Sequence, residues 1–215
     1  MAFAIQAWWD ERQDRQVIES ALRSMYDDFG KNVSIIDAVL QVHREIKDAS
    51  EFVMAHTGPE PIKYVDNSKL AQSILILTYR PILRPVTGSL DSLINSGRWK
   101  LLESGELQAK LAQWPTQVGR VNFREFQGEA TVTERLVPRI WQLTPIRSID
   151  VFDPRFEHIG ESRFASDYNL LLADLYFESA VDERWWDADE CIRNLNELSA
   201  LTKKILGLIQ QELDS

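Results

Sequence analysis

Three histidines, His43, His56 and His158, are the residues of this sequence most suited to bind a metal ion or to transfer protons. A di-iron helical bundle needs Glu-x-x-His motifs on two helices, but no glutamate lies three positions before any of these histidines. The zinc-protease pattern His-Glu-x-x-His is also missing. His43 falls on the apolar face of a predicted helix, which favours a packed core residue. The sequence therefore predicts no metal site and no cofactor.

Cys191 is the single cysteine, and it lies within a predicted helix with no histidine close to it in sequence. A small buried apolar role is the simpler interpretation of such a residue. The sequence contains no Gly-x-Ser-x-Gly motif and no glycine-rich nucleotide motif. A catalytic triad assembles in space, so an enzyme of unrecognised type stays an alternative. A histidine beside a carboxylate in a pocket would favour that alternative, but the prediction is a protein without catalysis.

An acidic run surrounds the pair Trp185-Trp186. Its members are Glu178, Asp182, Glu183, Asp187, Asp189 and Glu190. A solvated helix face explains the run most simply. The alternative is a patch for a cation or for a basic partner, anchored by the two tryptophans.

Polar residues are dense in Thr87–Gly97, a predicted short helix flanked by apolar runs. The simpler interpretation is a tight helical corner, with Thr87 accepting hydrogen bonds from free amides and Gly97 in the left-handed conformation. The functional interpretation is a site for a ligand or a partner. Its candidate residues are Arg84, Thr87, Asp91, Asn95 and Trp99.

The elements that must position these residues are predicted to be helices throughout. Apolar residues recur every three or four positions, and no run alternates with the period of a strand. The predicted helices cover residues 3–56, 67–78, 87–97, 104–141 and 163–213, with a possible break near Val181-Asp182. We expect an all-α fold, an elongated antiparallel bundle of three long helices. A short helical insert would cap the end far from Met1.

Composition limits the possible partners. The 215 residues include 44% hydrophobic and 27% charged residues, which excludes a disordered chain and a multi-span membrane protein. The formal net charge is −9, from 33 acidic and 24 basic residues. An acidic surface repels phosphate backbones and anionic lipid, so nucleic acid is not expected as a partner.

Eight of the first nine residues are apolar, and the stretch ends in Trp8 and Trp9, after which Asp10 begins a charged run. Paired tryptophans at such a border are typical of a membrane interface. An apolar helix start that packs on the bundle is the alternative. We expect residues 1–9 to be the end of a membrane-spanning helix and residues 10–215 to form one helical domain.

Two stretches resemble an uncharacterised bacterial family of single-span membrane proteins, a domain of unknown function. Ala7–Arg12 resembles the family's NxWNEER-type juxtamembrane sequence. Thr87–Gly97 resembles its T-x-x-L-x-x-L-x-x-S-G helix, and an N-x-x-L-R-x-x-L-like helix follows with Leu101, Leu107, Leu111 and Trp114. Ser104 departs from the family, because asparagine is common there.

The resemblance implies an architecture and no activity. It implies a bacterial single-pass protein whose span precedes Trp8, although only Phe3, Ala4, Ile5 and Ala7 of that span are present here. Family members carry basic residues before the span, so the positive-inside rule favours a periplasmic domain.

We therefore expect a membrane-tethered, non-catalytic helical module for protein–protein interaction or sensing. The expected partner is another protein or a second copy of the chain, as in a homo-oligomer. The alternative is a small-ligand-binding sensor domain with its site at the membrane-distal helical corner.

Overall fold

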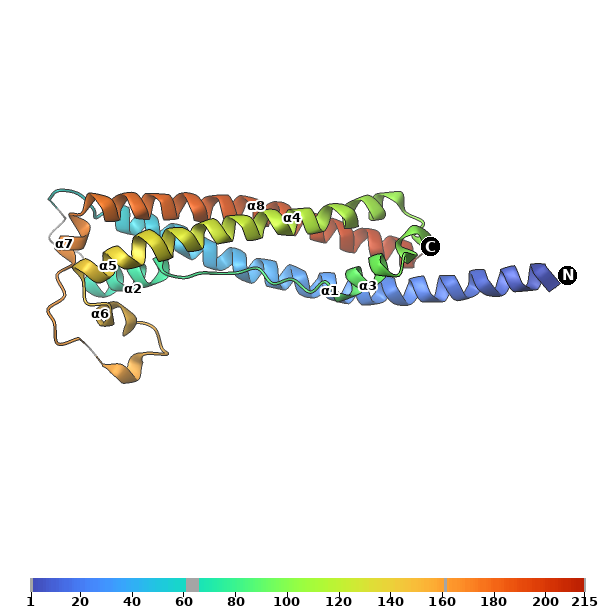
Figure 1. Cartoon of the computed structure of the whole chain (residues 1–215), viewed down its shortest axis with the longest axis horizontal. Coiled ribbons are helices and arrows are strands. Elements are labelled where there is room, and N and C mark those ends of the chain that lie inside the picture. The colour runs from blue at the N-terminus through green and yellow to red at the C-terminus, as the bar shows by residue number, and fades with distance from the viewer. Residues whose placement is uncertain (1, 61–65, 161, 215) are drawn as a thin grey trace. The chain divides into compact units, whose positions relative to one another are not determined.

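The structure is a computed structural model that describes residues 2–60, 66–160 and 162–214. It is all-α, as predicted, and the described residues contain no strand (Figure 1). Three helices are long: α1 (Ala2–Met54), α4 (Gly105–Ala130) and α8 (Leu175–Leu213). The shorter elements are α2 (Asn67–Leu77), α3 (Gly88–Asn95), η1 (Arg98–Leu101), the π-helical η2 (Thr131–Leu136), α5 (Val137–Leu143), α6 (Arg147–Asp150), η3 (Glu157–Ile159) and α7 (Tyr168–Leu172).

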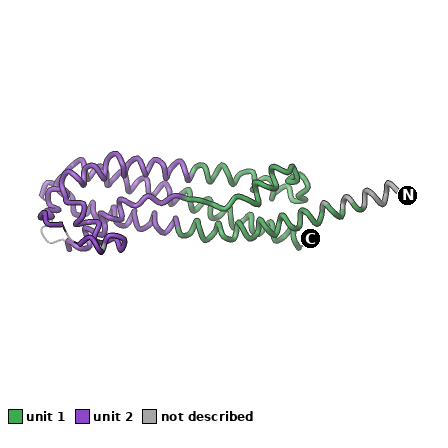
Figure 2. The backbone as a smooth tube through the Cα atoms, turned by 60° about the horizontal axis from the view of Figure 1, so that its bottom comes forward, with its two compact units in different colours: residues 1–38, 83–120, 194–215 green, residues 39–82, 121–193 purple. Residues whose placement is uncertain are grey.

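The chain divides into two compact units (Figure 2). Unit 1 comprises residues 1–38, 83–120 and 194–215, and unit 2 comprises residues 39–82 and 121–193. The core of unit 1 joins segments of the three long helices. The Phe29 and Trp114 rings lie 5.1 Å apart between centroids, and Trp114 Nε1 donates to Thr202 Oγ1 at 3.0 Å. Phe29 and Trp114 are almost completely buried, so they anchor α1 and α4 to each other.

Helix α3 belongs to unit 1 and is held on α1 by polar contacts. The buried Asn32 side chain donates to the carbonyl of Val86 at 2.8 Å and accepts from its amide at 2.7 Å. Asp28 Oδ2 accepts from the Ser89 amide at 3.3 Å and so occupies the helix start. Thr87 makes no side-chain cap, so its predicted role is wrong, whereas Gly97 has the predicted left-handed φ of 69°. The predicted place of this helix, far from Met1, is also wrong, because α3 packs on the first half of α1.

We expect Asn32→Asp to lower the free energy of unfolding by about 1–3 kcal/mol. A carboxylate can still accept from the Val86 amide, but it cannot donate to the Val86 carbonyl. Urea unfolding of this variant beside Asn95→Asp, an exposed change on α3, measures the effect. Equal stability of the two variants would contradict the role given to Asn32.

In unit 2 the three long helices have defined directions. Lys47 Nζ lies 2.8 Å from Asp189 Oδ1, and Trp185 Nε1 donates to Glu51 one turn further along α1. Arg124 of α4 lies 3.5 Å from Glu190 of α8, and Thr131, the first residue of η2, donates to Asp187 Oδ2 at 2.7 Å. Within unit 2, helix α8 is therefore antiparallel to α1 and α4, and α1 and α4 run in the same direction.

The last long helix begins at Leu175 and is unbroken at Val181-Asp182. The interruption lies instead between α7 and α8, where Asp174 Oδ1 accepts from the Phe177 amide at 2.8 Å. Arg139 Nε donates to the same carboxylate at 2.8 Å. Asp174 therefore ends one helical segment and caps the next, in the way an aspartate satisfies the free amides of a helix start.

The hydrogen bond from Arg139 holds the pKa of Asp174 below its ordinary value of 3.8. A lowered folded-state pKa stabilises the fold above the unfolded-state pKa, and this stabilisation is lost as the pH falls through the lower folded value. Asn also caps helices, so Asp174→Asn removes the charge and keeps the cap. We expect the variant to be less stable than the parent at neutral pH, with a difference that shrinks below pH 3.8. A pH-independent difference in urea unfolding would contradict this.

Candidate functional site

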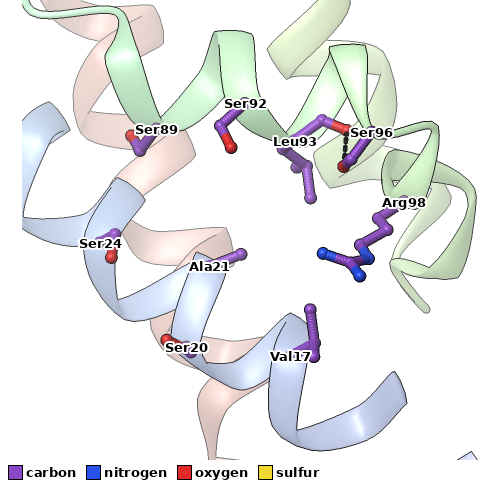
Figure 3. Close-up of a pocket in the computed structure, with 9 residues that line it drawn as sticks. All are labelled: Val17, Ser20, Ala21, Ser24, Ser89, Ser92, Leu93, Ser96 and Arg98. Atoms are coloured by element: carbon purple, nitrogen blue, oxygen red, sulfur yellow. Dashed lines mark hydrogen bonds between the residues drawn. The ribbon is translucent and has the colours of Figure 1, made fainter. Parts of the chain in front are cut away.

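A groove between α1 and α3 in unit 1 is the candidate functional site (Figure 3). Its volume is about 240 Å³. We call it the serine groove, and its lining residues are Val17, Ser20, Ala21 and Ser24 of α1 with Ser89, Ser92, Leu93, Ser96 and Arg98. Figure 3 shows the Arg98 guanidinium directed into the gap between the two helices, with Val17 and Leu93 on either side.

Helical spacing explains why these side chains gather. Ser20 and Ser24 are four residues apart on α1, so they share one helix face. Ser92 of α3 and Ser96, which caps the end of α3, have the same spacing. Small side chains leave space between the helices, and hydroxyl groups both donate and accept hydrogen bonds. Ser96 Oγ donates to the Leu93 carbonyl at 3.0 Å. The groove therefore presents several hydroxyl groups and one guanidinium to a compact ligand.

The serine groove includes part of the segment that the sequence singled out, but not the residues predicted there. None of the five predicted site residues, Arg84, Thr87, Asp91, Asn95 and Trp99, lines the serine groove. Arg84, Asp91 and Asn95 are exposed, while Thr87 and Trp99 are half-buried. The missed residues are the serines of both helices and Arg98. Their helical spacing was a usable signal, but the pairing of α1 with α3 arises only in the folded chain.

The predicted membrane interface lies at the start of α1. The Trp9 side chain is about half exposed, and the side chain of Trp8 lies outside the described part of the chain. Among the helices as described, none has a stretch long and apolar enough to cross a bilayer.

His43 and Glu125 form a buried pair in unit 2. His43 Nε2 lies 3.7 Å from Glu125 Oε1, and each side chain is 2% exposed. Both nitrogens of His43 lack a hydrogen-bond partner among the described residues. A carboxylate beside a histidine was the feature that would favour an enzyme, but a substrate could reach this pair only if the core opened. His56 is half-buried and His158 is exposed, and the described residues contain no cluster of three or more metal-binding side chains.

Arg184 of α8 is a second buried polar group of unit 2, only 2% exposed. Its guanidinium donates to the carbonyls of Leu77 at 3.2 Å, Tyr79 at 2.5 Å and Gly128 at 3.5 Å. Burial lowers the pKa of Arg184 to about 10, so the side chain stays charged at neutral pH. Arg184 thus ties the end of α2 to α4 and α8.

The acidic run of α8 is largely paired with basic side chains of unit 2. Asp189 contacts Lys47, Glu183 contacts Arg135, and Arg193 contacts Glu190. Asp187 accepts from Thr131, and burial raises its pKa. These contacts hold α8 to its neighbours and leave few acidic groups of the run to bind a partner.

Cys191 is buried, and burial raises the pKa of its thiol to about 12. About one thiol in 10,000 is then ionised at pH 8, and the thiolate is the reactive form. We expect the folded chain to react with a thiol reagent only slowly and the denatured chain to react fully. Ser92→Cys, at an exposed position of the serine groove, provides the control and should react at once. Rapid modification of native Cys191 would contradict its burial.

Comparison of the chain with protein-family models, with curated proteins and with solved structures finds no match.

Proposed function

We propose that this chain is a membrane-tethered helical module that acts by binding and not by catalysis, and that it senses a small ligand in the serine groove. The observation that carries this proposal is the groove itself, which is lined by serines of α1 and of the α3 segment and by Arg98 of η1. The buried histidine, carboxylate and thiol of unit 2 are closed to substrate, which favours binding over catalysis. We also propose that the long helices form one three-helix bundle, through which α1 connects the ligand site to the membrane.

The tether is proposed from the sequence of residues 1–9 and from the exposure of Trp9. Val17 follows Trp9 by eight residues of α1, which is about 12 Å of helix. The groove therefore lies near the proposed interface, instead of at the membrane-distal corner that the sequence suggested.

A screen of small neutral and charged compounds by NMR tests ligand binding. We expect a subset to shift the amide resonances of α3 and of the facing turns of α1. Ser92→Leu should abolish these shifts by filling the groove, whereas Asn95→Leu, on the same helix but outside the groove, should preserve them. Shifts that persist in Ser92→Leu, or the absence of any shift at the groove, would contradict the proposal.

Protein–protein interaction is the second candidate function, favoured by an aromatic pair on α4 in unit 2. Phe123 and Phe126 are 58% and 68% exposed, and a spacing of three residues places them on one helix face. Exposed aromatic residues of this kind are typical anchors of protein interfaces.

Light scattering across a concentration range tests whether the partner is a second copy of the chain. Self-association that disappears in a Phe123→Ser, Phe126→Ser double variant would support this function. A monomer mass that does not change with the concentration of the parent chain would exclude self-association through this face.

A further inference from the structure

We propose that the serine groove recognises a short-chain carboxylic acid, whose carboxylate binds Arg98. This inference rests on the proposed function, which requires a ligand in the groove but does not specify its charge. Arg98 is the only charged side chain among the nine lining residues, and none of the nine is acidic. The groove therefore offers a counter-charge to an anion and none to a cation.

Arg98 differs from several other basic residues of unit 1. Arg23 pairs with Glu19, Lys31 pairs with Asp28, and Lys204 pairs with Glu106. In the described part of the chain no carboxylate forms such a pair with Arg98. A guanidinium presents a planar fork of donors that matches a carboxylate in a bidentate geometry.

The charge of the groove favours a carboxylate over a phosphate. A phosphate at neutral pH carries more charge than one guanidinium neutralises, and the net charge of −9 on the chain adds repulsion. A monocarboxylate requires one counter-charge, which Arg98 provides. Both anions share the same hydrogen-bonding chemistry, so they must be compared directly.

The volume and the lining residues of the serine groove limit the part of the ligand beyond its carboxylate. A volume of about 240 Å³ is small for a ligand pocket. Val17 and Leu93 supply apolar contacts for a short hydrocarbon chain, while Ser92 and Ser96 can bond to a hydroxyl substituent. The geometry thus fits a short acid that carries a hydroxyl group.

Calorimetric titration of the whole chain with butyrate, 3-hydroxybutyrate, butyramide and inorganic phosphate tests this inference. Arg98→Gln removes the guanidinium, and Arg84→Gln is the matched control, because Arg84 is an exposed arginine of the same unit outside the groove. We expect 3-hydroxybutyrate to bind at least tenfold more tightly than butyramide and phosphate. Arg98→Gln should weaken acid binding at least tenfold, and Arg84→Gln should leave it unchanged.

The outcomes separate this inference from the proposed function. Equal affinity for butyrate and butyramide, tighter binding of phosphate, or full acid binding by Arg98→Gln would overturn the carboxylate assignment. Neutral compounds that still shift the groove resonances would leave the proposed function in place. If no acid binds and no compound shifts the groove, both are wrong.

Discussion

Replacement of Arg184 by methionine is expected to lower the free energy of unfolding by about 3–5 kcal/mol, because buried groups are left without partners. The guanidinium donates to the carbonyls of Leu77, Tyr79 and Gly128, which lie in segments distant in sequence. Methionine fills much of the volume but donates no hydrogen bond. The carbonyls of Leu77 and Tyr79 would then lose their guanidinium donor, and Asp187 would lose a neighbouring positive charge.

Urea unfolding monitored by circular dichroism measures this loss. Arg193→Met is the matched control, because Arg193 is an exposed arginine on the same helix whose ion pairs lie at the surface. Surface ion pairs contribute about 0–1 kcal/mol, so the control should change stability little. A loss for Arg184→Met as small as that of the control would mean that Arg184 does not hold the end of α2.

The second large effect is expected in unit 1 for Trp114→Ala, which should cost about 3–5 kcal/mol. The substitution removes the contact with the Phe29 ring and leaves a cavity between α1, α4 and α8. It also leaves Thr202 without the indole donor. Denaturant unfolding beside Trp141→Ala, a tryptophan that is 65% exposed, gives the comparison. Similar losses for the two variants would contradict the central place of Trp114 in the core.

Much of the helical content could be predicted because the apolar period extends over long segments. The predicted first helix, residues 3–56, differs little from α1, and the turn that contains Gly58 and Pro59 ends it as expected. The last helix starts later than the predicted residue 163, and the sequence left a break near Val181-Asp182 open. Val181 is buried, and the helix continues through Val181 and Asp182 without a break. The hydrogen bond that Asp174 accepts from the Phe177 amide marks the start of the helix.

Helix direction and the position of α3 were not predictable from periodicity. Short helices were expected to connect long antiparallel neighbours, but α3 returns to the first half of α1. The bonds that fix it there join Asn32 to Val86 and Asp28 to Ser89, pairs that are more than 50 residues apart. Such contacts leave no local pattern in the sequence.

Residue type alone was not enough to predict which polar side chains are buried. Arg184 reads as a surface residue, yet three carbonyls make its burial possible. The buried face of α8 runs through Val181, Arg184 and Ala188. His43 and Cys191 were expected in the core, and both are buried there.

The lining residues of the candidate site likewise could not be identified from residue type alone. The segment Thr87–Gly97 was identified from its density of polar groups, but Asp91 and Asn95 lie outside the groove. The serines that line it are individually unremarkable in the sequence. They line one groove only because α3 packs on α1.

Carboxylate binding through Arg98 of the serine groove is tested most directly by following the Nε–Hε NMR resonance of Arg98 while 3-hydroxybutyrate is added to the whole chain. We expect a saturable shift of this resonance, with smaller shifts at Ser92 and Leu93 and none at the Nε–Hε resonance of Arg84. An unchanged Arg98 resonance at saturating acid, or equal shifts at Arg84 and Arg98, would contradict it.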